Sequence, residues 1–236
     1  MMSEIEGLGN LRLGIGLLIV TELLTDLVLL IIAEAVLSIL PSSEVLIHGS
    51  LYPPINVQEL ARQLIERGEA GGYLFALLFA GFLAFVALII LIVVLIEAIR
   101  GFSTLNKYVK GSYLGIYGII VLFISAIANL IAEHSATFQI FQPTQLIGGA
   151  IGVIGYILIG IALYNIGRFY NQSLLKIGAI LIIIPFGFIG DLIPLLVSPI
   201  LLSTAVYSSL SLTLITLISS ILCYLGLNNA YKQRKQ

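Results

Sequence analysis

Long apolar segments without charged residues recur along the chain. Four uncharged runs of 27, 22, 33 and 40 residues cover 70–96, 111–132, 135–167 and 192–231. A transmembrane helix needs about 20 apolar residues to cross a hydrocarbon layer about 30 Å thick. Dividing the sequence at its turn signals therefore gives six predicted spans, at 11–38, 72–99, 112–132, 146–166, 174–196 and 202–225.

These spans predict an all-α membrane protein, with about six transmembrane helices in one bundle that forms a single domain over 1–236. The strands of a membrane β-barrel alternate polar and apolar residues with a period of two. This chain instead carries continuous apolar runs such as FVALIILIVVLI at 85–96, which favour helices. The first span is the least apolar because Glu22, Asp26 and Glu34 interrupt it.

The composition excludes several classes of protein. Hydrophobic residues make up 59% of the chain and charged residues 10%, and the mean hydropathy is +1.13. Soluble domains average about 45–50% apolar and about 25% charged residues, so a soluble, disordered or nucleic-acid-binding protein is not expected. Cys223 is the only cysteine, which excludes an intramolecular disulfide. The predicted partner is the lipid bilayer, with a second copy or another membrane protein left open.

Positive charges predict the orientation in the membrane. With six crossings, the two termini and the loops 101–111 and 167–173 share one side. That side and its helix ends hold nine of the 11 basic residues, and the other side holds Arg62 and Arg67. Because cytoplasmic loops carry an excess of Lys and Arg, we expect both termini to be cytoplasmic in a cell membrane. Tyrosines near these helix ends, Tyr170 among them, are predicted to be interfacial anchors.

The segment 41–70 is a polar insertion predicted to face outward. Asn56 and Glu59 form a plausible capping box, and Gly68 supplies a helix stop. The apolar spacing between them predicts a short extracytoplasmic amphipathic helix. Such a helix can cap the bundle, cover an entrance or dock a partner, and the sequence leaves these three roles open.

Candidate chemistry is confined to polar residues at membrane depth. Glu22 and Asp26 lie one turn apart on the same helix face, and Asn129 and Asp191 are placed by residue count in the outer third of the membrane. Two carboxylates so close together in a low dielectric should share a proton or hold a cation. We therefore predict an ion- or proton-binding site formed by Glu22, Asp26, Asn129 and Asp191.

The same residues also have a structural explanation, in which they bind no ion. Protonated acids can donate hydrogen bonds to Thr21, Thr25 or other hydroxyl groups and so lock helices together. The last span offers such hydroxyls in a single stripe, at Ser209, Thr213, Thr216 and Ser220. Stripes of small hydroxyl residues are common at close helix contacts.

Enzyme signatures are absent from the sequence. It contains no phosphate-binding loop, dinucleotide fingerprint, zinc-protease motif or nucleophile elbow. The two histidines, His48 and His134, fall in different outward loops without companions at ligand spacing. We therefore expect no enzyme activity, no cofactor and no metal site.

Three segments resemble a known family. They are MSEIEGL at 2–8, YNIGRFYNQSLLKIGAILIIIP at 164–185, and IGDLIPLL at 189–196. Together they are similar to the archaeal family of uncharacterised multipass membrane proteins called domain of unknown function 973. The resemblance implies an archaeal cell membrane but no activity, and no catalytic residue is carried over. The family pattern leads us to expect an uncharged residue where Asp191 stands.

Two functional hypotheses follow from the sequence. In the first, the protein is a non-catalytic structural or accessory membrane component. In the second, it is a small proton- or cation-coupled transporter or channel that uses its intramembrane carboxylates. A transporter predicts that these acids face a shared hydrated cavity, whereas a scaffold predicts that they are hydrogen-bonded to Ser or Thr or face a partner chain.

Overall fold

The fold is built from long helices. The computed structural model describes residues 2–39, 45–47, 50–52, 70–135, 143–188 and 200–236. This part of the chain contains six α-helices, which are α1 (Met2–Ile39), α3 (Ala70–Leu105), α4 (Tyr113–Ser135), α5 (Pro143–Phe169), α6 (Ser173–Phe188) and α8 (Leu202–Lys235). The prediction of a helical protein is thus confirmed. Each helix overlaps one of the six predicted spans.

Three short strands, which the sequence analysis did not predict, accompany the helices. β1 (Val45–Ile47) pairs antiparallel with β2 (Ser50–Tyr52) and with β3 (Ile200–Leu201), in the order β2-β1-β3. β1 and β2 are mostly apolar, although they lie within 41–70, which the sequence analysis treats as a polar insertion. The amphipathic helix predicted between Asn56 and Gly68 lies outside the described residues, as do Arg62 and Arg67.

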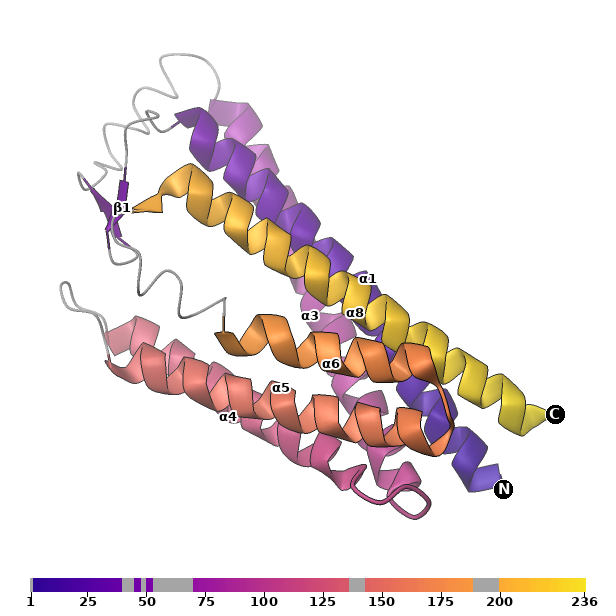
Figure 1. The fold of residues 1–236 in the computed structure, drawn as a ribbon. Helices are drawn as coiled ribbons and strands as arrows, with labels where there is room; N and C mark the ends of the chain where they lie inside the picture. The colour runs from indigo at the N-terminus through magenta and orange to yellow at the C-terminus, as the bar shows by residue number, and fades with distance from the viewer. Residues whose placement is uncertain (1, 40–44, 48–49, 53–69, 136–142, 189–199) are drawn as a thin grey trace.

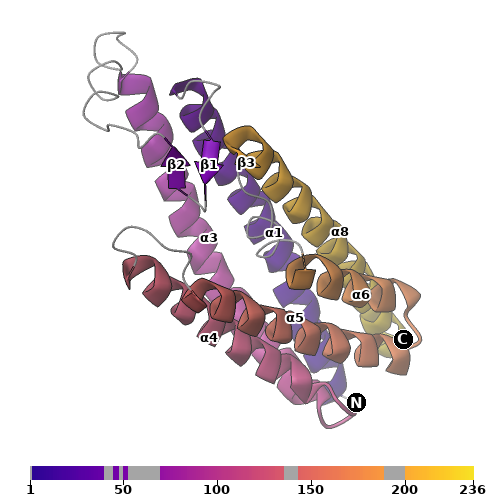
Figure 2. The ribbon, with the colours of Figure 1, turned by 60° about the vertical axis from the view of Figure 1, so that its left-hand side comes forward.

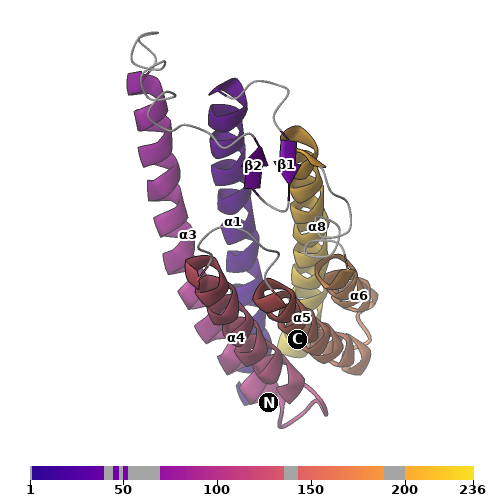
Figure 3. The same cartoon turned by 90° about the vertical axis from the view of Figure 1, so that its left-hand side faces the viewer.

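The helices are arranged in two layers. In one layer α1 lies between α3 and α8, and in the other α5 lies between α4 and α6 (Figures 2 and 3). Contacts of α3 with α4 and of α6 with α8 join the layers at their edges. The layers diverge toward the end where the strands lie (Figure 1). Both termini and the turns 106–112 and 170–172 lie at the opposite end, called the terminal end below.

Of the side chains whose burial is described, those that form the core gather near the terminal end. Its completely buried large side chains come from five helices and include Leu8, Leu105, Leu163, Leu175 and Leu227. These residues lie within the first or last few turns of their helices. Among the side chains that the structure describes, those of the terminal end are therefore the most tightly packed.

Glycines let α6 and α8 approach closely within this core. A Cβ atom built on Gly226 of α8 would lie 2.5 Å from the backbone nitrogen of Leu175 in α6. A Cβ atom built on Gly178 of α6 would lie 2.9 Å from the backbone nitrogen of Cys223 in α8. The two backbones therefore touch at two successive levels, where no side chain fits between them.

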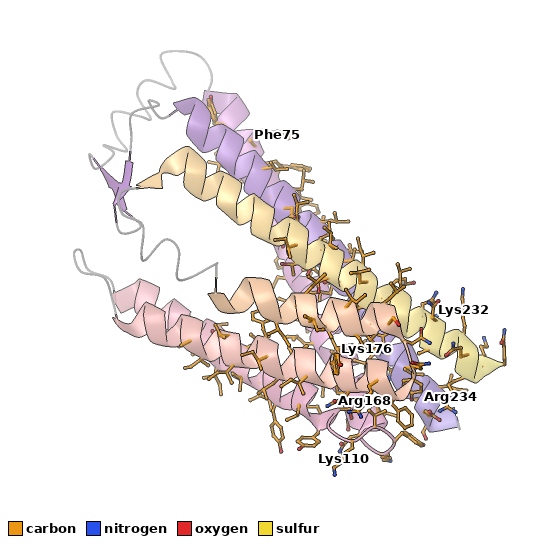
Figure 4. The ribbon with its side chains drawn as sticks, in the orientation of Figure 1. Phe75, Lys110, Arg168, Lys176, Lys232 and Arg234 are labelled. Carbon is orange, nitrogen blue, oxygen red and sulfur yellow. The ribbon has the colours of Figure 1, made fainter. Side chains whose placement is uncertain are left out.

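Large apolar side chains cover much of the outer surface. On α3, Phe75, Leu78 and Phe82 are 71%, 66% and 61% exposed, and Phe75 projects from the bundle in Figure 4. Soluble monomers rarely expose contiguous apolar patches larger than a few hundred Å². Such a surface fits a lipid solvent, in which apolar side chains are stable facing outward.

Three helices are long and apolar enough to span a membrane by length and composition. Within the described ranges these are Gly71–Leu105, Gly149–Phe169 and Leu214–Lys235. The apolar segments Tyr113–Ala128 and Ser173–Ile183 are shorter, and the predicted first span, 11–38, is not among the three. The prediction of membrane-spanning helices is thus supported for half of the six spans.

Candidate functional site

The predicted acidic pair lies where α1 packs against α8. Glu22 and Asp26 lie near the middle of α1, and the hydroxyl group of Ser220 in α8 donates a hydrogen bond of 2.9 Å to Oε1 of Glu22. Ser220 belongs to the hydroxyl stripe predicted from the sequence. The contact joins residues 198 positions apart in the chain. Glu22 is therefore part of the packing between the two helices.

Two oxygen atoms of the acidic pair are buried without a hydrogen-bond partner in the described part of the chain. They are Oε2 of Glu22 and Oδ1 of Asp26. An unsatisfied polar atom in an apolar environment costs about 1–3 kcal/mol, and more when the group is charged. A shared proton or a bound cation would relieve this cost. The pair therefore leaves two buried acceptor oxygens that a proton or a cation could satisfy.

The neighbouring threonines do not donate to the acids. The Thr21 hydroxyl group donates to the carbonyl oxygen of Leu17 at 3.0 Å, and that of Thr25 donates to the carbonyl oxygen of Thr21 at 2.9 Å. Both hydroxyl protons are therefore used within α1 itself. Of the hydroxyl groups that the sequence offers as partners, that of Ser220 donates a hydrogen bond to an acid of the pair.

The other two predicted site residues are placed less completely. Asn129 lies in α4, but its side chain is outside what the structure describes. Asp191 lies outside the described residues altogether. The structure therefore brings together Glu22 and Asp26 and leaves a four-residue site as a prediction. Among the described residues, no group of three His, Cys, Asp or Glu side chains could hold a metal ion.

A second polar cluster, which sequence reasoning missed, ties the terminal end together. Tyr170 donates a hydrogen bond of 2.9 Å to Oε1 of Glu4, and Nε of Arg234 lies 3.3 Å from the same oxygen. The guanidinium group of Arg234 also lies over the Tyr170 ring, 5.5 Å from its centroid. These three side chains, called the Glu4 cluster below, connect α1, the α5–α6 turn and α8.

Tyr170 is therefore not the interfacial anchor that the sequence predicts, since it is only 7% exposed. Burial raises the pKa of the Tyr170 phenol above its ordinary value, and the hydrogen bond to Glu4 raises it further. Both effects disfavour the tyrosinate, which would lose the bond and face the carboxylate. No signal in the sequence marks Tyr170, because its partners lie on segments distant in the chain.

More hydrogen bonds join the same segments. Nη1 of Arg12 donates to Oδ1 of Asn228 at 3.1 Å, and its guanidinium group lies 4.2 Å from the Tyr231 ring centroid. Nε2 of Gln172 donates to Oε1 of Gln233 at 2.8 Å. Each contact links α8 to α1 or to the α5–α6 turn. The polar groups of the terminal end therefore act to hold helices together.

A family model matches nearly the whole chain. The family model described as "Protein of unknown function (DUF973)" matches residues 4–236. No curated protein and no solved structure matches the chain.

Proposed function

Since the chain belongs to this family of proteins of unknown function, we propose from its helices that it is a multi-pass protein of the cell membrane with a non-catalytic structural or accessory role. In this proposal the bundle crosses the bilayer six times and both termini are cytoplasmic. The membrane is archaeal, as the sequence resemblance implies. The partner would be a second copy of the chain or another membrane protein.

The apolar outer surface is the observation that carries this proposal. Large aliphatic and aromatic side chains are exposed on α3, α4 and α8, as at Phe75, Phe123 and Ile218. In water this surface would drive aggregation, whereas in lipid it is stable. The exposed Lys and Arg side chains of the terminal end, by contrast, suit contact with water and headgroups (Figure 4).

The polar contacts inside the bundle support a structural role for the protein. The Glu22–Ser220 hydrogen bond joins α1 to α8, and Ser219 of α8 donates to the carbonyl oxygen of Gly178 in α6 at 2.7 Å. Interhelical hydrogen bonds of this kind contribute about 1 kcal/mol each in membranes. They fix one arrangement of helices, which is what a scaffold requires.

Single-cysteine labelling from the two faces of the membrane tests this proposal. Residue 106, an exposed position in the α3–α4 turn, should react only from the cytoplasmic side. Residue 58, in the predicted outward insertion, should react only from outside. Both results are expected because the positive charges gather at the terminal end.

The buried oxygens of Glu22 and Asp26 favour proton- or cation-coupled transport as a second candidate function. Intramembrane carboxylates are costly, and they are common in ion and proton pathways. In this candidate the pair takes up a proton or a cation at each cycle, and Ser220 holds Glu22 in place. The two candidates differ in whether the pair must change its charge.

Replacing Glu22 with Gln and Asp26 with Asn separates the candidates. The amides keep the shape of protonated acids, so we expect the double variant to fold with a melting temperature within a few degrees of the wild type. Transport predicts that wild-type vesicles carry a proton flux, read by an internal pH dye, which the double variant abolishes. A scaffold predicts no flux in either protein, and collapse of the variant would contradict protonation of the pair.

A further inference from the structure

Three exposed or half-exposed cations of the terminal end lie on neighbouring segments. Lys110 lies just before α4, Arg168 lies in the last turn of α5, and Lys176 lies in the first turn of α6 (Figure 4). These three residues are called the basic triad below. They lie beside the α3–α4 and α5–α6 turns at the terminal end, on neighbouring segments of the layer of α4, α5 and α6, although 66 positions separate the first from the last.

Close contacts hold the segments of the basic triad in place. A Cβ atom built on Gly111 would lie 2.7 Å from Nδ2 of Asn165, one turn before Arg168. A Cβ atom built on Gly167 would lie 3.0 Å from Cγ of Lys176, so the stem of this lysine lies against the α5 backbone. The α3–α4 turn and the start of α6 thus both contact the last turns of α5, the helix that carries Arg168.

The basic triad has no acidic partner within the described ranges. The salt bridges found there join Arg100 to Glu97 and Arg234 to Glu4. Arg12 is likewise engaged, by Asn228. Three positive charges on adjoining segments without a counter-charge repel one another, and a bound anion would remove that repulsion.

Apolar side chains flank the basic triad on the side away from the terminal end. Tyr164 lies one turn before Arg168 and is 38% exposed, and Ile180 lies one turn after Lys176 and is 46% exposed. On α4, Tyr117 is 56% exposed. Cations near the terminal end, with exposed apolar side chains one turn further from that end, match a ligand that has an anionic head and a hydrocarbon tail.

We propose that the basic triad binds the phosphate headgroup of an anionic phospholipid, whose acyl chains lie along Tyr164 and Ile180. This inference rests on the proposed function, because it needs the terminal end to lie at the boundary between water and lipid. Cationic pockets between transmembrane helices are suited to anionic headgroups. A soluble phosphate would use the charges but not the apolar flank.

Native mass spectrometry of the purified full chain in nonionic detergent tests the proposal. The probes are phosphatidylglycerol and the zwitterionic phosphatidylcholine. We expect the wild type to bind phosphatidylglycerol at least about tenfold more tightly than phosphatidylcholine. The variant Lys110→Gln/Arg168→Gln/Lys176→Gln should lose about tenfold of this affinity, since each basic side chain near a headgroup contributes attraction.

A matched control variant also removes three positive charges from the terminal end. The variant Lys107→Gln/Lys232→Gln/Lys235→Gln changes three other exposed cations and should lower the affinity less than threefold. The proposal would be overturned if the two variants lost equal affinity, or if the wild type showed no preference for phosphatidylglycerol. It would also be overturned if millimolar inorganic phosphate displaced the lipid fully. Extraction of the wild type from membranes by alkaline carbonate would instead contradict the proposed function itself.

Discussion

A Gly226→Val variant is expected to be about 3 kcal/mol less stable than the wild type, the largest loss that we predict for a single substitution. The built Cβ atom already lies 2.5 Å from the backbone nitrogen of Leu175 and 2.8 Å from its Cα. Backbone atoms cannot rotate away as a side chain can, so α6 and α8 must separate. Overpacking of this kind costs about 1–3 kcal/mol and occasionally more.

Gly81→Val is the matched control, because nothing lies within 4 Å of a Cβ atom built on Gly81 of α3. We expect its stability to stay within about 0.5 kcal/mol of the wild type, as for most exposed substitutions. Thermal unfolding in one detergent, followed by helical circular dichroism, measures both variants. Equal losses at the two positions would contradict the close approach of α6 to α8.

A Tyr170→Phe variant is expected to lose about 1–3 kcal/mol, because it leaves buried Oε1 of Glu4 with one donor fewer. The ring and its contact with the guanidinium group of Arg234 remain, so the change isolates the hydroxyl group. Tyr117→Phe is the control, since this tyrosine is 56% exposed and its ring packs edge-on against Tyr113. The control should change the stability by less than about 0.5 kcal/mol.

The pH dependence of the melting temperature, compared between the wild type and Tyr170→Phe, gives a second measurement. Burial and the Glu4 hydrogen bond raise the pKa of Tyr170, so the folded protein holds this proton more tightly than the unfolded chain. The resulting stability is complete below the unfolded pKa of about 10 and is lost as the pH rises above it. The difference in melting temperature between wild type and Tyr170→Phe should therefore shrink above about pH 10. A difference that stays constant to pH 11 would contradict the assignment.

The helices could be predicted from the sequence because uncharged runs define them directly. Predicted starts at 112, 174 and 202 lie within one residue of the starts of α4, α6 and α8. α8 continues ten residues beyond the predicted span 202–225, since the polar tail stays helical to Lys235. Asn228 and Tyr231 there pack on Arg12, a tertiary contact that no local pattern shows.

The candidate site could be predicted only in part. The spacing of Glu22 and Asp26 places both on one face of α1, but the choice of Ser220 as partner depends on how α8 is rotated against α1. The Glu4 cluster could not be predicted, because its three members come from the two ends of the chain and one turn. The short strands were missed because three-residue apolar segments carry too little pattern to identify a strand.

Labelling with a membrane-impermeant maleimide tests the six-crossing topology most directly. Asn106→Cys, Gln58→Cys, Ser3→Cys and Gln236→Cys are made singly in a Cys223→Ala background, which removes the one native thiol. In intact cells we predict that residue 58 reacts, and that residues 3, 106 and 236 react only after permeabilisation. Reaction of residue 106 in intact cells, or of one terminus without the other, would contradict a bundle whose two ends share the cytoplasmic side.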